Sequence, residues 1–552
     1  MGEGIGIVLG IDLGTTNSAC AVVQDGRASV VRRGTERIVP SLVAALPDGS
    51  FVVGEEARRQ QLLRPSQVVF GAKRLLGRRF GSPQVQKMRE IVPYRIVEGP
   101  NEAVMLELAG QSLSVVEIAA YILRYLRQLG EEALGQPVKR CVIAVPAGFS
   151  DSQRSATRVA AELAGLDVVR LINEPTAAAL AYGYIEDTDK RLAVYDFGGG
   201  TFDVTVLQIT RNVFEVLSTA GEMFLGGEDI DEAILNDILA AFDPAHREAL
   251  ASHAAARQRL RGVAEELKMR LSEEPSAAVH VENVLPGSGL ALDYRLDQAS
   301  LKALIEPLVV RTATICGEAL ATAGIRREQL DEVVLVGGTT RLPLVRQVAV
   351  EAFGRLPQTS INPMSVVAVG AAIQGAALLG SLVPVASSHP ASAVPATAQT
   401  VLLDVTSRSL GVATVGGYVD FVIERNVVIP TEQTRLFTTT VDQQRYVRIQ
   451  ICQGESQIFA ENIKIGELVL TELSPAERGE PTIAVTFEIN ADGLLEVRAV
   501  DRATGQEQFV TIRVPGELSS KDLQEVRPPA GPVDGEIASR PPLSGTDRGQ
   551  CG

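Results

Sequence analysis

Two stretches of the chain place an aspartate at the end of an apolar run and follow it with glycine and threonine. The first, IVLGIDLGTTNSACAVV, covers residues 7–23, and the second, YDFGGGTFDVTVL, covers residues 195–207. Consecutive glycines weaken a strand, because glycine loses the most backbone entropy on ordering and has no side chain to pack. The three glycines at 198–200 therefore indicate a turn whose bare backbone has something to approach.

The residue types of these turns suit a phosphate ligand. Adjacent peptide N–H groups without side chains form a concave donor surface for phosphate oxygens. Asp12, Asp196 and Asp203 would repel a phosphate unless a divalent cation lies between, so they predict Mg²⁺ held largely through water. Three hydroxyls can contact the same phosphates: Thr15, Thr16 and Thr201. Two ordinary hairpins are the alternative, but the repeated pattern favours a nucleotide, and neither stretch fits a P-loop or a Rossmann turn.

Composition sets the class of protein. A chain of 552 residues with 45% apolar and 22% charged residues is typical of a soluble globular protein with two or more domains. The net charge of -15 argues against nucleic acid or an anionic membrane as a partner. The five cysteines form no C-x-x-C pair, which predicts neither a disulfide framework nor a zinc site. Residues 1–10 have no signal-peptide pattern and residues 368–386 indicate a packed helix, so we expect a cytoplasmic protein.

The elements that position these residues change along the chain. Residues 1–382 alternate strand and helix patterns, which predicts an α/β domain. A Pro/Ala/Ser-rich insert and linker follows at 383–404, and period-two alternation at 405–516 predicts a β-sandwich. Residues 517–552 are expected to be a disordered tail without a helical lid, because Pro528 and Pro529 would stop any helix that begins there.

Eight ordered segments give the chain a family resemblance: GIDLGTTNSACAVV, FGAKRLLGRRF, VIAVPAGFSDSQRSAT, LINEPTAAALAYG, YDFGGGTFDV, FLGGEDID, VGGTTRLP and VLLDVTSRSLG. Together they resemble the seventy-kilodalton heat-shock (DnaK-type) chaperones, over roughly residues 5–515. The resemblance implies a two-lobed actin-like ATPase domain with a deep nucleotide cleft, followed by a β-sandwich that binds peptide. The two glycine turns would then be the paired phosphate loops of the lobes.

The resemblance also implies roles for single residues, with ATP or ADP and Mg²⁺ as cofactors. Asp12 and Asp196 would hold the metal. Four residues would act in hydrolysis: Lys73, Glu174, Thr201 and Asp203. The remaining nucleotide contacts would come from Gly14, Thr15, Thr16, Asn17, Gly198, Gly199, Gly200, Thr201, Glu265, Lys268, Ser272, Gly337, Gly338, Thr339 and Arg341. The expected reaction is phosphoryl transfer to water, in which positioning and charge neutralisation carry most of the catalysis.

The second half of the function would be peptide binding. The implied pocket uses Val412, Phe437, Val447, Ile449 and Ile483, which periodicity alone would assign to the sandwich core. Unfolded or extended polypeptides are the expected clients, with a J-domain co-chaperone and a GrpE-type nucleotide-exchange factor as further partners. The implied coupling runs through residues 401–404, with Pro146 and Arg154 as a relay. The implied co-chaperone surface consists of Arg170, Asn173 and Thr176.

Departures from the family pattern keep other functions open. Gly148 replaces an aromatic residue, Met364 and Ser365 replace an acidic pair, and Val415 and Thr440 occupy the positions that arch over bound peptide in the family. The alternatives are an ATPase or small-molecule kinase of the actin-like fold with a regulatory β-domain, and a nucleotide-dependent filament. Without a lid, a chaperone of this kind is expected to release peptide quickly in both nucleotide states.

Overall fold

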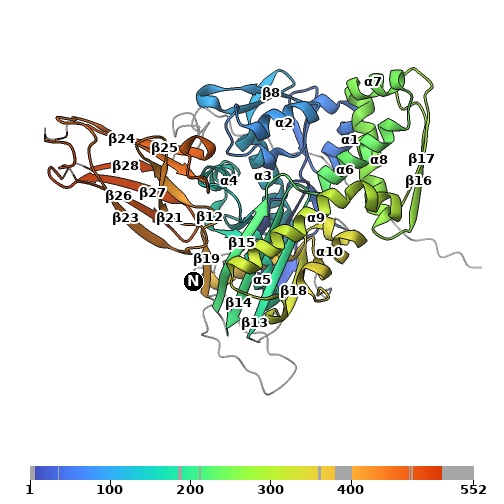
Figure 1. Ribbon diagram of the computed structural model, residues 1–552. Coiled ribbons are helices and arrows are strands. Elements are labelled where there is room, and N and C mark those ends of the chain that lie inside the picture. The colour runs from blue at the N-terminus through green and yellow to red at the C-terminus, as the bar shows by residue number, and fades with distance from the viewer. Residues whose placement is uncertain are drawn as a thin grey trace, which may run out of the picture.

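The structure is a computed structural model, shown in Figure 1. It describes residues 7–511 except 35–36, 184–188, 211–212, 359–361, 380–400, 472, 474–475, 481 and 506. The predicted Pro/Ala/Ser-rich insert at 383–400 and the predicted tail at 517–552 lie outside the described residues. The expectation of a missing lid therefore remains a prediction.

The first lobe is built on a mixed sheet in which an antiparallel meander meets two parallel strands. Its order is β12-β11-β1-β2-β3, with β4 paired to β2. Because β1 pairs antiparallel with β2 and parallel with β11, the turn after β1 emerges at one edge of the sheet. The strand bounds are β1 Val8–Asp12, β2 Asn17–Gln24, β3 Arg27–Val30, β4 Val39–Pro40, β11 Arg140–Val145 and β12 Asp167–Asn173.

The second lobe repeats this arrangement. Its sheet has the order β18-β13-β14-β15-β19-β22. Strands β13, β14 and β15 form an antiparallel meander, and β18 pairs in parallel with β13. The bounds are β13 Lys190–Phe197, β14 Phe202–Thr210, β15 Val213–Glu222, β18 Glu332–Val336, β19 Val401–Val405 and β22 Val428–Ile429. The two glycine–threonine stretches thus occupy the same position in two similar sheets.

Helices cover both sheets and fill the space between the lobes. The bounds are α3 Val115–Leu134, α4 Asp151–Leu163, α5 Glu174–Gly183, α6 Gly227–Ala240, α8 Ala254–Leu271, α9 Gln298–Thr322, α10 Pro343–Phe353 and α11 Val366–Leu378. Ser150 caps α4 in a capping box with Gln153. The central helices α5 and α11 approach closely, because a Cβ on Gly370 would lie 1.7 Å from the carbonyl oxygen of Ala177.

Smaller elements form the outer parts of the two lobes. In the first lobe they are β5 Val43–Ala45, β6 Phe51–Val53, α1 Glu55–Leu63, β7 Val68–Val69, α2 Pro83–Ile91, β8 Arg95–Glu98, β9 Val104–Leu108 and β10 Gln111–Ser114. In the second lobe they are α7 Pro244–Ser252, β16 Ser276–Val281 and β17 Leu292–Asp297. Among the described residues, no helix is long and apolar enough to cross a membrane.

A β-sandwich follows the second lobe and lies beside α4 and β12 (Figure 1). One sheet has the order β21-β20-β24-β25 and the other β23-β26-β27-β28. The bounds are β20 Leu410–Ala413, β21 Val419–Ile423, β23 Thr431–Phe437, β24 Val447–Gln453, β25 Ile463–Leu470, β26 Ile483–Ile489, β27 Leu495–Asp501 and β28 Glu507–Thr511. The alternation predicted from the sequence is present in β26, where every second residue belongs to the core: Ile483, Val485, Phe487 and Ile489.

The described cysteines are free and buried: Cys20, Cys141, Cys316 and Cys452. Burial raises the pKa of the Cys20 thiol to about 12, so this group is an unreactive thiol at neutral pH. Cys551 lies outside the described residues.

Candidate nucleotide-binding site

The two glycine–threonine turns face one cavity of about 580 Å³ between the lobes. The first turn joins β1 to β2, and the second joins β13 to β14. All the residues expected to contact nucleotide line this cavity, from Gly14 in the first turn to Arg341 after β18. The fold therefore collects in one place residues that lie more than 300 positions apart in the sequence.

The bare glycine backbone has a steric cause. A Cβ on Gly199 would lie 1.9 Å from Oγ1 of Thr16, and a Cβ on Gly200 would lie 2.6 Å from Oγ1 of Thr15. Only glycine lets the second turn come this close to the first. The glycines thus keep open a narrow cradle whose walls are peptide groups and threonine hydroxyls, which suits the phosphates of a nucleotide.

A cluster of carboxylates lies beneath the turns. Asp12 ends β1, and Asp196 near the end of β13 is directly opposite Asp203 on β14. The pKa values of Asp12 and Asp203 are raised from 3.8 to about 7, mainly by burial and then by the charge of Glu174, while Lys73 acts in the opposite direction. The pKa of Asp196 is raised well above 3.8 by burial and by the neighbouring carboxylates. Negative charge is therefore crowded at this point.

This crowding fits a divalent cation. Oδ2 of Asp203 is buried and has no hydrogen-bond partner among the described residues. No three histidine, cysteine, aspartate or glutamate side chains in the described part of the chain could hold an ion together. Mg²⁺ readily keeps several waters and binds phosphate oxygens, so Asp12 and Asp196 could hold it through its water shell.

Lys73 and Glu174 form a buried ion pair beside the carboxylates. Lys73 lies in a single 3₁₀ turn, Ala72–Arg74, and Glu174 begins α5. Nζ of Lys73 is 2.5 Å from Oε1 of Glu174, and each side chain is 8% exposed. Asp203, which belongs to the same predicted set, is buried next to Asp196 and is not one of the residues that line the cavity.

The opposite end of the cavity holds the residues expected to contact adenosine. Glu265 and Lys268 lie on α8, and Ser272 follows it. The ammonium group of Lys268 bonds Asp231 at 2.7 Å and the carbonyl oxygen of Gly227 at 3.1 Å, so α6 fixes its position. Met364, one of the departures from the family pattern, lines the cavity close to Gly338.

The sequence reasoning missed several groups around the cavity. Asp231 and Gly227 hold Lys268, and Oε1 of Glu228 accepts a hydrogen bond from Oγ1 of Thr16 at 3.1 Å. All three belong to the segment FLGGEDID, which carried the resemblance and could have identified them. Glu55 and Arg58 of α1 also line the cavity, and no motif pointed to them.

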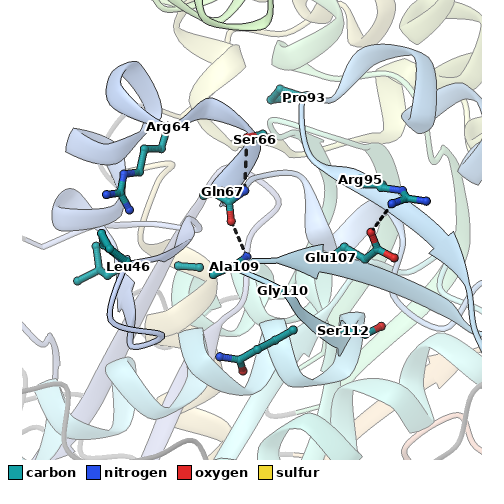
Figure 2. A pocket seen from close by; sticks show the side chains of 13 residues that line it. Leu46, Arg64, Ser66, Gln67, Pro93, Arg95, Glu107, Ala109, Gly110 and Ser112 are labelled. Carbon is teal, nitrogen blue, oxygen red and sulfur yellow. Dashed lines mark hydrogen bonds and ion pairs between the residues drawn. The ribbon is translucent and has the colours of Figure 1, made fainter.

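A second, larger hollow of about 790 Å³ lies on the outer part of the first lobe, where the tip of the β9–β10 hairpin faces the end of α1. Figure 2 shows its lining, in which Arg95 and Glu107 form an ion pair at 2.8 Å. Oε1 of Gln67 accepts a hydrogen bond from the Ala109 N–H at 2.6 Å. None of the predicted site residues lines it, so size alone does not mark the functional site.

The residues of the expected peptide pocket lie in the sandwich core. Val412, Ile449 and Ile483 are buried, whereas Phe437 and Val447 are partly buried at its margin. Phe437 of β23 is directly opposite Ile483 of β26. The five residues thus belong to one apolar cluster, and the two marginal ones are the members that a ligand could reach.

The linker and the sandwich contact the first lobe through Asp404 and Asp492, and through the Leu495 N–H, which donates to Asp151 at 2.6 Å. Asp404 at the end of the linker accepts hydrogen bonds from Nδ2 of Asn173 at 2.8 Å and from Oγ1 of Thr176 at 3.4 Å. Asp492, in the turn between β26 and β27, forms a short ion pair with Arg158 and accepts a bond from the Leu171 N–H at 3.1 Å.

Arg154, the expected relay residue, bonds Asn173 at 2.6 Å and the carbonyl oxygen of Asp492 at 3.2 Å. Nε of Arg170 is 3.7 Å from Asp492. The residues expected at the co-chaperone surface, Arg170, Asn173 and Thr176, therefore all contact the linker or the sandwich in this structure. The linker itself continues the second lobe, because β19 pairs in parallel with β15.

Taken together, two actin-like lobes around a nucleotide cavity and a β-sandwich in contact with them define a nucleotide-binding ATPase with a second, all-β domain. A family model described as Hsp70 protein matches residues 8–532. The chain therefore belongs to the Hsp70 family. At the level of this family it is an ATP-dependent chaperone that uses ATP and Mg²⁺.

Proposed function

We propose that the protein hydrolyses ATP to ADP in the cavity between the lobes and couples the hydrolysis to binding of extended apolar segments by the sandwich. The observation that carries this proposal is the convergence of both glycine turns, Asp12, Asp196 and the Lys73–Glu174 pair on one cavity. The contacts of Asp404 and Asp492 with the first lobe support the coupling, because they join the sandwich to that lobe.

Each group in the cavity has a task in this reaction. The peptide groups at Gly199 and Gly200 and the hydroxyls of Thr15 and Thr16 bind phosphate oxygens. Asp12 and Asp196 would hold Mg²⁺ through water, and the bound ion would supply positive charge to the phosphates.

The remaining groups act at the γ-phosphate. Thr201 and Lys73 orient it, with Lys73 held in place by Glu174 at 2.5 Å. Asp203 has a free carboxylate oxygen, which can orient the attacking water.

The same surfaces suggest how partners act. A J-domain co-chaperone that binds Arg170, Asn173 and Thr176 has to share these residues with Asp404 and Asp492. Such a partner would therefore act on the contact between the domains. A GrpE-type exchange factor would instead act on the distance between the two lobes, which enclose the nucleotide.

Two variants test the assignment of the cavity. We expect Asp12→Asn and Thr201→Ala to bind ATP but to hydrolyse it at least tenfold more slowly, because each loses a group that orients metal or γ-phosphate rather than adenosine. Single-turnover hydrolysis gives the rate, and nucleotide titration gives the affinity. Thr210→Ala, an exposed threonine at the far end of β14, is the matched control.

Turnover close to that of the unaltered protein in both variants would show that hydrolysis occurs elsewhere. The same assay with and without an unfolded apolar peptide separates a chaperone from a small-molecule kinase. A chaperone of this family should hydrolyse ATP faster with the peptide present, whereas a kinase should not respond.

A further inference from the structure

The carbonyl oxygens of the second glycine turn are all hydrogen-bonded, but not by the same lobe. The first two residues of α6, in the second lobe, donate their N–H groups to the carbonyl oxygens of Gly198 and Gly199, at 3.0 and 2.8 Å. The carbonyl oxygen of Gly200 instead accepts a hydrogen bond at 3.1 Å from Nη2 of Arg74, which belongs to the first lobe. The third carbonyl of the turn is therefore held only while the lobes are in contact.

Arg74 is fixed in this position by the start of α6. Its side chain is 4% exposed, and Nη2 also donates to Oδ2 of Asp229 at 2.7 Å. Nη1 lies 3.5 Å from Oε2 of Glu228, whose other oxygen accepts the hydroxyl of Thr16 in the first turn. Burial lowers the pKa of Arg74, but the charges of Glu228 and Asp229 raise it above its ordinary value, so the guanidinium stays charged. A buried pair of this kind keeps its geometry, because breaking it leaves an uncompensated charge.

An aromatic ring from the second lobe lies against the same guanidinium. Phe224 precedes α6 and, together with Met223, packs against the hydrophobic core of the first lobe. The guanidinium carbon of Arg74 lies 5.1 Å from the centroid of the Phe224 ring, which is a cation–π contact. The segment between β15 and α6 thus crosses to the first lobe and encloses Arg74 beside the glycine turn.

The place of Arg74 in the chain connects this contact to the γ-phosphate. Lys73 is its neighbour in the 3₁₀ turn Ala72–Arg74, and Thr201 directly follows Gly200. Lys73 and Thr201 are the residues that orient the γ-phosphate in the proposed function, and each comes from a different lobe. The hydrogen bond from Arg74 to Gly200 therefore joins the two backbone segments that carry them.

We propose that Arg74 is a positioning residue for ATP hydrolysis, which sets the separation of Lys73 and Thr201 around the γ-phosphate. The inference rests on the proposed function and deepens it. Arg74 is not one of the residues that line the cavity, so it acts through Lys73 and Gly200 and not by touching the nucleotide. A displacement of about 1 Å in the groups that orient a substrate can cost roughly a hundredfold in rate.

The test compares Arg74→Gln with the unaltered protein in two assays. Single-turnover hydrolysis measures the rate for bound ATP, and titration with ADP measures an affinity to which no γ-phosphate contributes. We expect Arg74→Gln to slow hydrolysis at least tenfold and to change the affinity for ADP less than threefold. A role limited to holding the lobes together would weaken ADP binding as well, because both lobes line the cavity.

Asp229→Asn tests whether the effect passes through the buried pair. Asparagine keeps an oxygen for the N–H of Gly226, which the Asp229 carboxylate accepts at 2.9 Å, but it loses the charge that holds Arg74. We expect hydrolysis to slow at least threefold, with no further slowing when Asp229→Asn is added to Arg74→Gln, because both changes break one interaction. Arg79→Gln is the matched control, since Arg79 is exposed and pairs with Glu102 of the same lobe. It should hydrolyse ATP at the rate of the unaltered protein.

Normal hydrolysis in Arg74→Gln, with the unaltered protein active, overturns this inference and leaves the proposed function intact. Equal losses of hydrolysis and of ADP affinity also overturn it. If Arg74→Gln does not fold, Asp229→Asn decides by the same comparison of hydrolysis with ADP affinity. An unaltered protein that hydrolyses no ATP refutes the proposed function first, and this inference with it.

Discussion

Asp492 offers the sharpest test of how the sandwich is held against the first lobe. Its carboxylate forms the ion pair with Arg158 and accepts the Leu171 N–H at 3.1 Å. Asp492→Ala removes both interactions and the longer contact with Arg170 at 3.7 Å. It leaves in place the backbone of the turn between β26 and β27, where the Asp492 carbonyl oxygen accepts a bond from Arg154. The bonds to Arg158 and Leu171 are both charge-assisted hydrogen bonds, a class that contributes about 1.5–3 kcal/mol each, and solvent screening at this partly exposed contact reduces their sum. We therefore expect the contact between the domains to lose about 2–4 kcal/mol.

Hydrogen exchange of β19 measures this loss, because Val401–Leu403 pair with β15 while Asp404 holds the sandwich to the lobe. A free energy of about 1.4 kcal/mol corresponds to a factor of ten. A loss of about 2–4 kcal/mol should therefore speed the hydrogen exchange of this strand by roughly 30-fold to 700-fold. Asp442→Asn is the matched control, since Asp442 lies in another sandwich loop and accepts a bond from Arg478 of the same domain.

Unchanged protection of β19 in Asp492→Ala, with the sandwich still folded, would refute this reasoning. It would mean that Asp404, the strand pairing and the Leu495–Asp151 hydrogen bond hold the domains together without the Asp492 carboxylate. Faster exchange in Asp442→Asn to the same extent would also refute it, because the effect would then reflect general loosening of the sandwich.

Three further predictions concern the pocket, the metal and the stability of the nucleotide-free protein. We expect Val447→Phe to fold but to bind a labelled apolar peptide at least tenfold more weakly in fluorescence anisotropy, because the ring would fill the margin of the apolar cluster. Val469→Phe, on an exposed position of β25, should bind normally, and equal affinity in both variants would make Val447 a core residue only. We also expect the affinity for Mg·ADP to rise between pH 6 and pH 8, because the pKa values of Asp12 and Asp203 are about 7 and bound protons compete with the metal below that value. Calorimetry at three pH values measures this slope, which Asp12→Asn should flatten; a slope that falls with pH would contradict the carboxylate cluster. As the pH rises from about 4 to about 7, the nucleotide-free protein should become less stable. In this range the unfolded chain has already released the protons of Asp12 and Asp203, at the ordinary pKa of 3.8, whereas the folded protein still holds them.

The sequence predicted best the features that depend on local pattern. The paired turns after Asp12 and Asp196 and the alternating strands of the β-sandwich follow from periodicity and from residues a few positions apart. The family resemblance supplied the partners that are distant in sequence, such as Lys73 and Glu174, which lie 101 positions apart. The cavity then placed all the expected nucleotide contacts together.

The contacts between the domains could not be predicted in the same way. The turn at 490–493 has the sequence of an ordinary hairpin turn, yet Asp492 reaches residues more than 300 positions earlier. The tertiary arrangement alone gives these residues their surroundings.

The pairing of β19 with β15 determines where the chain can be shortened without exposing an unpaired strand edge. Val401, Leu402 and Leu403 cover the edge of β15 at Val213, Phe214 and Glu215. A shortened ATPase fragment that ends before residue 401 would leave the N–H and C=O groups of this edge open to strands from other molecules. Such a fragment should aggregate more readily than one that ends after Val405. The linker strand is thus also the cover that keeps the second lobe from self-association.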